Sequence, residues 1–396
     1  MKTRPVLPGV EWVGAVDWQR GLFDALIPLP DRTSYNSYLI RGSEKTVLVD
    51  ATEPNLVHVL MTRLEDVEKI DYILSLHAEQ DHSGGLPVVM EKYPQAQLLA
   101  SPKGKENLST HLSIPADRIR AVQDGETLSL GDKTLHFIHI PWVHWPDTLA
   151  AYLVEDRLLF TTDFFGSHLA TSDLFASANV PRVYAAAKRY YAEIMMPLRS
   201  MVQKNLEKLQ GLELAFIAPS HGPVYDQPEF ILDAYRQWIG GPLRNTVVLP
   251  FVSMHGSTLQ MASYFCESLA ERGVAADPFD LTNTDIGRIA EALVDAPTLV
   301  IGTPTMLGGP HPGVVGATFL VNMLRPRLKY LSVIGSYGWG GRTVEILTEM
   351  LTALKTETLT PVLCKGLPGE TDFQALDALA DAIAERHTTL AEGTGI

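Results

Sequence analysis

Short apolar runs separated by polar turns dominate the first half of the chain. We expect strands at residues 37–40, 46–49, 72–76, 98–100, 135–140 and 158–161. Helical patterns lie mostly between or after these runs. Residues 182–209, rich in Ala, Lys, Tyr and Met, predict a helix that is interrupted at Pro197. The first half therefore predicts mixed sheets flanked by helices.

The second half alternates more regularly. Apolar strands are expected near Thr246, Leu299, Leu331 and Val362, and each is followed by a glycine-containing loop and a helical pattern. This order predicts a doubly wound parallel sheet. The turn Gly240-Gly241-Pro242 separates the two patterns. We therefore expect two domains, at residues 1–242 and 243–396.

Composition narrows the class of protein. With 46% hydrophobic and 20% charged residues, the 396-residue chain can bury a sizeable core. Its net charge of -14 opposes binding to nucleic acid or to an anionic membrane. The two cysteines, Cys266 and Cys364, lie far apart and outside any CxxC spacing, so we expect core thiols. Without an apolar run of about 18 residues, no membrane span is expected, and the default location is cytoplasmic.

The densest candidate chemistry is the segment His77-Ala78-Glu79-Gln80-Asp81-His82, directly after an expected strand. If the segment is extended, His77, Glu79 and Asp81 point to one side, and His82 turns toward a second centre. One loop would then serve two metal ions. The alternative is a solvated polar turn.

Three later blocks favour the metal site. His144 follows the expected strand 135–140 among proline and tryptophan residues. Asp163 ends the apolar strand 158–161, where an unpaired carboxylate would be costly to bury. His221 stands at a further strand end with a glycine behind it. These residues complete a set of seven candidate ligands.

The second half contains candidate flavin-binding loops. The loop after the first strand has small residues and no Lys or Arg, which suits the phosphate of flavin mononucleotide (FMN) better than a nucleoside triphosphate. Two more glycine-rich loops follow strands of the same expected sheet and contribute aromatic faces for the isoalloxazine ring. An ordinary strand-to-helix turn and core aromatics are the alternatives. The candidate flavin contacts are Ser253, Met254, His255, Gly256, Ser257, Thr258, Pro304, Thr305, Met306, Leu307, Ser336, Tyr337, Gly338, Trp339, Gly340 and Gly341.

Through these blocks, residues 30–225 resemble the metallo-beta-lactamase-like half of flavodiiron proteins, also called A-type flavoproteins. Residues 245–390 resemble a flavodoxin, although Met306 replaces the asparagine found in many relatives. The resemblance implies an α/β protein: an N-terminal metallo-beta-lactamase-like αββα sandwich followed by a C-terminal flavodoxin-like doubly wound parallel sheet.

The resemblance also implies roles for the candidate ligands. His77, Glu79 and His144 would hold one iron, and Asp81, His82 and His221 the other, with Asp163 bridging. Glu79 stands where hydrolases of the superfamily usually carry histidine, and the added oxygen donor favours iron over zinc. His168 is a candidate for orienting a ligand, the alternative being a structural histidine.

The implied activity is that of an oxidoreductase. Electrons would pass from a donor through FMN to two iron ions, which reduce dioxygen to water or, alternatively, nitric oxide to nitrous oxide. The chain lacks a rubredoxin-like cysteine pair, so we expect a separate donor such as rubredoxin or a reduced deazaflavin. A head-to-tail homodimer, or a dimer of dimers, would bring Trp339 and the flavin of one subunit to Glu79 and the irons of the other. The competing classes are a dinuclear zinc hydrolase and an electron carrier with a structural metal site.

Overall fold

The chain folds into two compact units in this computed structural model, which describes residues 2–393. The first unit contains the residues up to Tyr191 together with Leu198–Ile239. The second contains Ala192–Pro197 and the residues from Gly240 onward. The two units are described separately.

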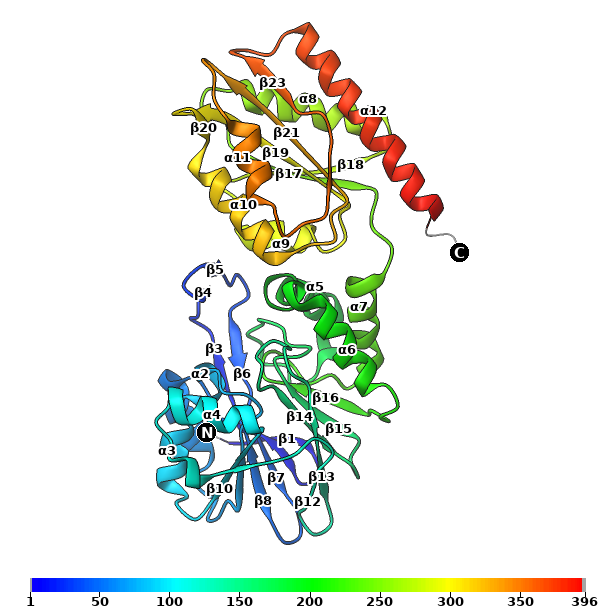
Figure 1. The fold of residues 1–396 in the computed structure, drawn as a ribbon. Coiled ribbons are helices and arrows are strands. Elements are labelled where there is room, and N and C mark those ends of the chain that lie inside the picture. Colours follow the sequence, from blue (N-terminus) through cyan, green and yellow to red (C-terminus); the bar gives the residue numbers. More distant parts are fainter. Residues whose placement is uncertain (1, 394–396) are drawn as a thin grey trace. The chain divides into compact units, whose positions relative to one another are not determined.

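Two sheets form the centre of the first unit (Figure 1). The strand order of the larger sheet is β1 (Arg4–Leu7), β2 (Val10–Trp12), β7 (Tyr38–Arg41), β8 (Thr46–Val49), β9 (Tyr72–Leu74), β10 (Gln97–Ala100) and β11 (Ile119–Ala121). The order of the smaller sheet is β12 (Thr127–Ser129), β13 (Thr134–His139), β14 (Leu149–Leu153), β15 (Leu158–Thr162) and β16 (Phe216–Pro219). Strands β8 to β11 run parallel, as do β15 and β16.

Both sheets bury one face against the other and cover the second face with helices. Tyr38 from the larger sheet and Phe137 and Phe160 from the smaller one belong to the core between the sheets. The helices over the larger sheet include α1 (Val57–Arg63), α3 (Leu86–Lys92) and α4 (Pro102–His111), and those beside the smaller sheet are α5 (Val180–Tyr190), α6 (Arg199–Leu209) and α7 (Pro228–Gly240) (Figure 1). This arrangement confirms the predicted αββα sandwich.

Two small ribbons extend from this unit. Strand β3 (Ala15–Asp17) pairs with β6 (Thr33–Tyr35), and the hairpin of β4 (Leu22–Phe23) and β5 (Ile27–Pro28) lies between them in the chain. Neither ribbon was predicted from the sequence. The predicted break at Pro197 is present: α5 passes into a π-helical turn at Tyr191–Met195 and a 3₁₀ turn at Met196–Leu198 before α6 begins.

The second unit is a parallel sheet with helices on both faces. Its order is β18 (Ala275–Asp280), β17 (Thr246–Phe251), β19 (Thr298–Met306), β21 (Tyr330–Tyr337) and β22 (Glu357–Thr358), with β23 (Val362–Lys365) also paired to β21 and the short β20 (Gly309–Pro310) to β19. Helices α8 (Ser257–Glu271) and α12 (Glu370–Gly393) cover one face, and α9 (Ile286–Ala292), α10 (Pro312–Leu324) and α11 (Thr343–Met350) the other (Figure 1). This confirms the predicted doubly wound sheet. Over the part of the chain that the structure describes, no helix combines the length and apolar character needed to cross a membrane.

Candidate functional site

The seven candidate ligands come from strand ends of the first unit and lie together. His77 and Glu79 follow β9, Asp163 follows β15 and His221 follows β16. His144 lies in the loop after β13. Because the ends of neighbouring strands meet at one edge of a sheet sandwich, residues far apart in the sequence converge here.

The expectation of an extended segment from His77 to Asp81 is wrong beyond Glu79. The short helix α2 (Gln80–Ser83) begins directly after Glu79, which keeps an extended backbone. Asp81 and His82 therefore project from a helical turn. As a result, Asp81 joins His82 in the second group of side chains instead of sharing a side with His77 and Glu79.

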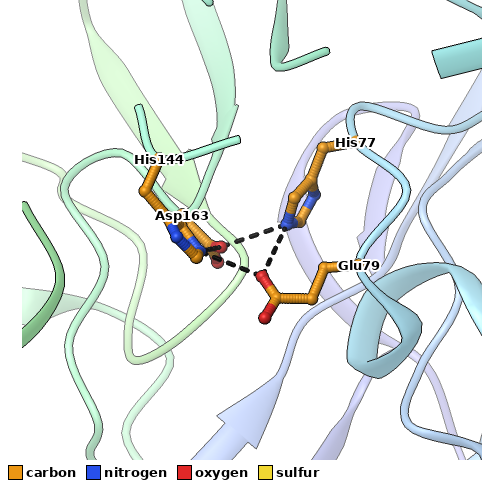
Figure 2. Close-up of side chains that lie close together, drawn as sticks. All are labelled: His77, Glu79, His144 and Asp163. Atoms are coloured by element: carbon orange, nitrogen blue, oxygen red, sulfur yellow. Dashed lines mark hydrogen bonds and ion pairs between the residues drawn. The ribbon is translucent and has the colours of Figure 1, made fainter. Parts of the chain in front are cut away.

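The first group consists of His77, Glu79, His144 and Asp163, whose ligand atoms all lie within 4.8 Å of one another. The Nε2 atom of His144 is 2.9 Å from Oε2 of Glu79 and 3.0 Å from Oδ2 of Asp163. The Nε2 atom of His77 is 3.1 Å from the same Asp163 oxygen. Figure 2 shows these nitrogen and oxygen atoms pointing toward one another, with His77 and Glu79 on one loop and His144 and Asp163 on two others.

The second group consists of Asp81, His82 and His221. The Nε2 atoms of His82 and His221 lie 3.2 and 3.5 Å from Oδ2 of Asp81. The same two nitrogens lie 3.1 and 3.4 Å from Oδ1 of Asp163. Asp163 thus presents one carboxylate oxygen to each group, which is the geometry that a bridging ligand needs.

Hydrogen bonds on the far side of two rings fix which nitrogen faces the centre. The Nδ1 atom of His77 lies 2.8 Å from Oγ1 of Thr162. The Nδ1 of His221 lies 2.6 Å from the carbonyl oxygen of Ser34, to which it donates. In both rings Nε2 is left for a metal ion, as is usual for histidine ligands.

The electrostatics of the metal-free site favour added positive charge. Burial is the largest single effect and lowers the pKa of His77, but the charge of Asp163 and the contacts with Asp163 and Glu79 together outweigh it and raise the value to about 10. Burial also lowers the pKa of His144, but its contacts with Asp163 and Glu79 outweigh this effect and raise the value to about 9. The pKa of His82 is also raised well above 6.5 by Asp81 and Asp163, despite burial. The three carboxylates therefore hold protons on these imidazoles where cations are absent.

Unpaired polar atoms support the same interpretation. Apart from their close contacts within the two groups, the Nε2 atoms of His77 and His82 and one carboxylate oxygen each of Asp81 and Asp163 are buried without a hydrogen-bond partner among the described residues. Buried polar groups are normally satisfied, so an unpaired set of mixed nitrogen and oxygen donors fits metal coordination. The residues present thus fit a pair of metal ions.

His168 lies beside the second group and not in it. Its Nδ1 atom is 3.0 Å from Oγ1 of Thr33, which also lies 3.2 Å from Nδ1 of His221. The ring centroids of His168 and His221 are 4.9 Å apart. The structure therefore places His168 in contact with a candidate ligand, and its role in orienting that ligand stays a prediction.

The three candidate flavin loops lie at the carboxyl ends of β17, β19 and β21, which are adjacent strands. Pro304 of β19 pairs with Ser336 of β21, and Oγ1 of Thr258 is 3.4 Å from Oγ of Ser336. The strands reach further than expected, so residues 304–306 and 336–337 still belong to β19 and β21 and not to the loops.

The first of these loops has the form of a phosphate cradle. The backbone N–H groups of Gly256 and Leu259 both donate to Oγ of Ser253, at 3.2 and 3.1 Å, at the start of the 15-residue helix α8. Gly256 has a φ of +93°, and no atom lies within 4 Å of the place where a Cβ would be. Ser253 satisfies these two N–H groups, and a phosphate at this helix N-terminus would be bound by the other N–H groups of the first turn and by hydroxyl groups of the loop.

The other two loops leave large apolar side chains uncovered. Leu307 is 90% exposed and Trp339 is 75% exposed. The loops lie together, because the backbone N–H of Arg342 donates to the carbonyl of Gly308. Exposed apolar side chains beside a phosphate cradle fit the flat isoalloxazine ring.

Sequence reasoning missed several residues of the site. Thr33 and Thr162 orient candidate ligands, and Asp50 is buried beside His82 and His77, where burial raises the pKa of its carboxyl to about 6. Tyr190 is buried and lies against the rings of His168 and His221. The sequence signal for Thr162 and Asp50 was their position at the end of an apolar strand; Thr33 and Tyr190 have no comparable signal.

Comparison with known proteins extends over nearly the whole chain. The family model described as ODP family beta lactamase matches residues 33–222, and the flavodoxin model matches residues 249–383. The chain is 34% identical over 392 residues to a protein of Moorella thermoacetica named nitric oxide reductase, covering 96% of this chain and 98% of that one. It is 31% identical to the rubredoxin-oxygen oxidoreductase of Megalodesulfovibrio gigas, covering 97% and 98%. The crystal structure of the flavodiiron protein from Giardia intestinalis superposes with a TM-score of 0.91 at 26% identity, covering 99% and 98%.

Proposed function

The chain belongs to the flavodiiron protein family of oxidoreductases, and we propose that it reduces dioxygen to water with electrons that an external donor passes through FMN to a di-iron centre. The observation that supports this most strongly is Asp163, which presents one oxygen to each of two ligand groups in a chain that also contains a flavodoxin domain. In this proposal residues 1–242 hold the metals and residues 243–396 hold the flavin.

The proposed ligand assignment follows the two groups. His77, Glu79 and His144 would hold one iron, Asp81, His82 and His221 would hold the other, and Asp163 would contribute one oxygen to each. When bound, the iron pair would supply one-electron redox changes and open coordination positions for a small oxidant, and FMN would supply electrons to the irons one at a time.

The protein's own residues prepare the site for this chemistry. Thr162 and Ser34 hold the rings of His77 and His221 with Nε2 facing inward. Three carboxylates against two divalent ions leave a small positive excess, which favours electron transfer into the site. His168 and Tyr190, both buried, restrict the entry of water beside the second group.

In this proposal the first flavin loop binds the phosphate of FMN, and the other two loops contact its ring. The loop of residues 253–258 at the N-terminus of α8 would hold the phosphate of FMN, and the exposed side chains of Leu307 and Trp339 would contact the isoalloxazine ring. No lysine or arginine lies in residues 253–258, so the phosphate relies on neutral donors.

Nitric oxide is the second candidate substrate. The relative from Moorella thermoacetica is named as a nitric oxide reductase, and its identity to this chain is slightly higher than that of the oxygen reductase. Both reactions need two adjacent ferrous ions with open positions, so the ligand set suits both. A zinc hydrolase or an electron carrier with a structural metal would leave either the flavodoxin domain or the paired ligand groups without a role.

The donor and the assembly complete the proposal. A relative's name contains rubredoxin, which makes rubredoxin the first donor to test, with a reduced deazaflavin as the alternative. We further propose a head-to-tail homodimer, alone or as a dimer of dimers, in which Trp339 of one subunit faces Glu79 of its partner. Size-exclusion chromatography with turnover measurements tests this, since a fully active monomer would contradict it.

One set of measurements tests the function. Purified protein should show flavin absorption bands and about two iron ions per chain, and should consume dioxygen or nitric oxide with reduced rubredoxin. The variant His144→Ala should lose one iron and its turnover while keeping its FMN. Zinc without flavin would indicate the hydrolase, and unchanged iron content in the variant would refute the assignment of His144.

A further inference from the structure

Four tyrosines and one tryptophan form a connected cluster around α5 and α7 of the first unit. Tyr184 and Tyr191 lie seven residues apart at the two ends of α5, about two helical turns, and so share a face of that helix. Tyr235 and Trp238, three residues apart, share a face of α7. The ring centroid of Tyr191 lies 5.3 Å from that of Tyr235 and 5.4 Å from that of Trp238. The two aromatic faces therefore pack against each other.

One end of this cluster reaches the proposed metal site. The ring centroid of Tyr190 lies 4.8 Å from that of His168 and 5.8 Å from that of the candidate ligand His221. The Cζ atom of Tyr190 is only 2.9 Å from the place where a Cβ on Gly166 would be, so the ring lies closely against the loop after β15. Tyr190 directly precedes Tyr191, and consecutive Cα atoms are about 3.8 Å apart. These two tyrosines thus connect the site to the rest of the cluster.

The other end of the cluster reaches solvent. The ring centroid of Trp238 lies 5.3 Å from that of Tyr235 and 5.4 Å from that of Tyr184. The Nε1–H of Trp238 donates to the hydroxyl oxygen of Tyr184 at 3.2 Å. Trp238 is 3% exposed, whereas Tyr184 is 38% exposed. Tyr184 is therefore the member of the cluster that can exchange a proton with solvent and meet a solute.

The residue types matter more than the packing. Phenylalanine would fill similar space, and Phe164 and Phe165 do pack against Tyr235, at 5.5 and 4.9 Å between ring centroids. Only phenol and indole side chains, however, give up an electron to an oxidant of moderate strength. The cluster thus offers closely spaced, oxidisable rings from a candidate ligand to the surface.

The proposed reaction creates a use for such a path. Dioxygen takes four electrons and four protons to become two water molecules, so a shortage of donor leaves the oxidant incompletely reduced beside the ligand side chains. We propose that the aromatic cluster is a one-electron path, which supplies the missing electron from the surface and thereby protects the ligands from oxidation. The path consists of Tyr190, Tyr191, Tyr235, Trp238 and Tyr184.

This inference rests on the proposed function for its oxidant. For each electron that passes, the oxidant at the site is reduced by one electron and takes up one proton from solvent. Tyr184 loses one electron, and its O–H bond breaks as the proton leaves to solvent. The phenoxyl radical then takes a hydrogen atom from a thiol in solution, whose S–H bond breaks, and two of the resulting thiyl radicals couple to a disulfide.

Hydrogen peroxide tests the path without an electron donor, because one peroxide takes two electrons and two protons to form two water molecules. Protein loaded with iron and FMN, both oxidised, is mixed with peroxide, frozen rapidly and examined by electron paramagnetic resonance. We expect a tyrosyl radical that glutathione removes, and no radical in the metal-free protein. In Tyr184→Phe, which removes only a partly exposed hydroxyl, the radical should become that of a tryptophan and resist glutathione.

A second variant interrupts the path in its buried part. Trp238→Phe keeps an aromatic ring, but the electron can no longer come from Tyr184 through the indole. The remaining radical should resist glutathione, and peptide mass spectrometry should show more oxidised His221 than in wild type. The control is Tyr72→Phe, which removes a phenol from β9 of the same unit, outside the cluster, and should change neither result.

Turnover separates this path from a merely structural role. With excess donor, Tyr184→Phe should keep the wild-type kcat for dioxygen, since the path acts only when electrons are short. The absence of a protein radical in iron-loaded wild type would overturn the path. So would a radical that is lost in Trp145→Phe but unchanged in Tyr184→Phe, because Trp145, 6.2 Å from His77 between ring centroids, is the competing exit. A wild type that forms the Tyr184 radical but consumes neither gas would support the path and refute the proposed function.

Discussion

Removing the metals and returning them should release protons. In the metal-free protein, Asp163 and its neighbouring carboxylates raise the pKa of His77 to about 10 and that of His144 to about 9 against the effect of burial. The pKa of His82 is raised well above its usual 6.5 by Asp81 and Asp163, again despite burial. At pH 8 these three imidazoles therefore hold protons that a metal ion must displace.

The magnitude follows from that count. Loading two divalent ions at pH 8 should release about three protons per chain, and the apparent affinity for the metal pair should rise about a thousandfold per pH unit between pH 7 and 8. Stability of the metal-free protein should change in the opposite direction. A raised histidine pKa stabilises the fold below about pH 6.5, and this contribution is lost as the pH rises through about 9 and 10.

Anaerobic titration of the metal-free protein with Fe²⁺ in weak buffer, followed with a pH indicator, gives the proton count. Calorimetry in two buffers of different ionisation enthalpy provides an independent value. His58→Ala, which removes a histidine outside the proposed ligand set, should leave the count unchanged. Metal uptake at pH 8 without proton release would refute the reasoning, since it would mean that the imidazoles were already neutral.

Three substitutions test other parts of the structure. Thr162→Val should weaken metal retention about 10- to 100-fold in a chelator challenge, because the Nδ1 partner of His77 is lost; Thr162→Ser should not. Gly256→Ala should raise the Kd for FMN, measured by flavin fluorescence, by about tenfold or less, because a φ of +93° is strained for alanine. Ala25→Gly should raise the free energy of unfolding by about 1 kcal/mol or less, because relief of the positive φ (about 1–2 kcal/mol) exceeds the added entropy of glycine in the unfolded chain (about 0.4–1 kcal/mol); an unchanged urea midpoint would contradict this.

The sequence predicted the strands that follow simple hydrophobic patterns and missed those that do not. Strand β8 was predicted with its observed bounds, since the apolar run at Thr46–Val49 lies between polar turns. Strand β18 was not expected, because Asp277 and Pro278 interrupt its apolar character. Proline is tolerated there because β18 is at the edge of the sheet, a fact known only once the strand order is known.

The same distinction applies to the site. The seven candidate ligands could be selected from the sequence because each lies at or shortly after the end of an expected strand, where exposed chemistry is usual. Thr33 could not, because its hydroxyl lies 3.2 Å from the His221 ring, 188 residues away in the chain. Such residues can be identified only from contacts between segments that are distant in the sequence.

The two proposed cofactor sites differ in how their binding depends on pH, so acid should release iron before FMN. The metal site gathers three carboxylates that require cations, so protons and metal ions compete for the same imidazoles. The flavin loops bind a phosphate with backbone N–H groups, which do not titrate. The phosphate of FMN gains about one proton near pH 6, whereas the metal site gains about three as its ions leave. Desalting at about pH 5 should therefore remove iron while most of the flavin absorbance stays with the protein, and loss of flavin before iron would show that the phosphate cradle is weaker than its geometry indicates.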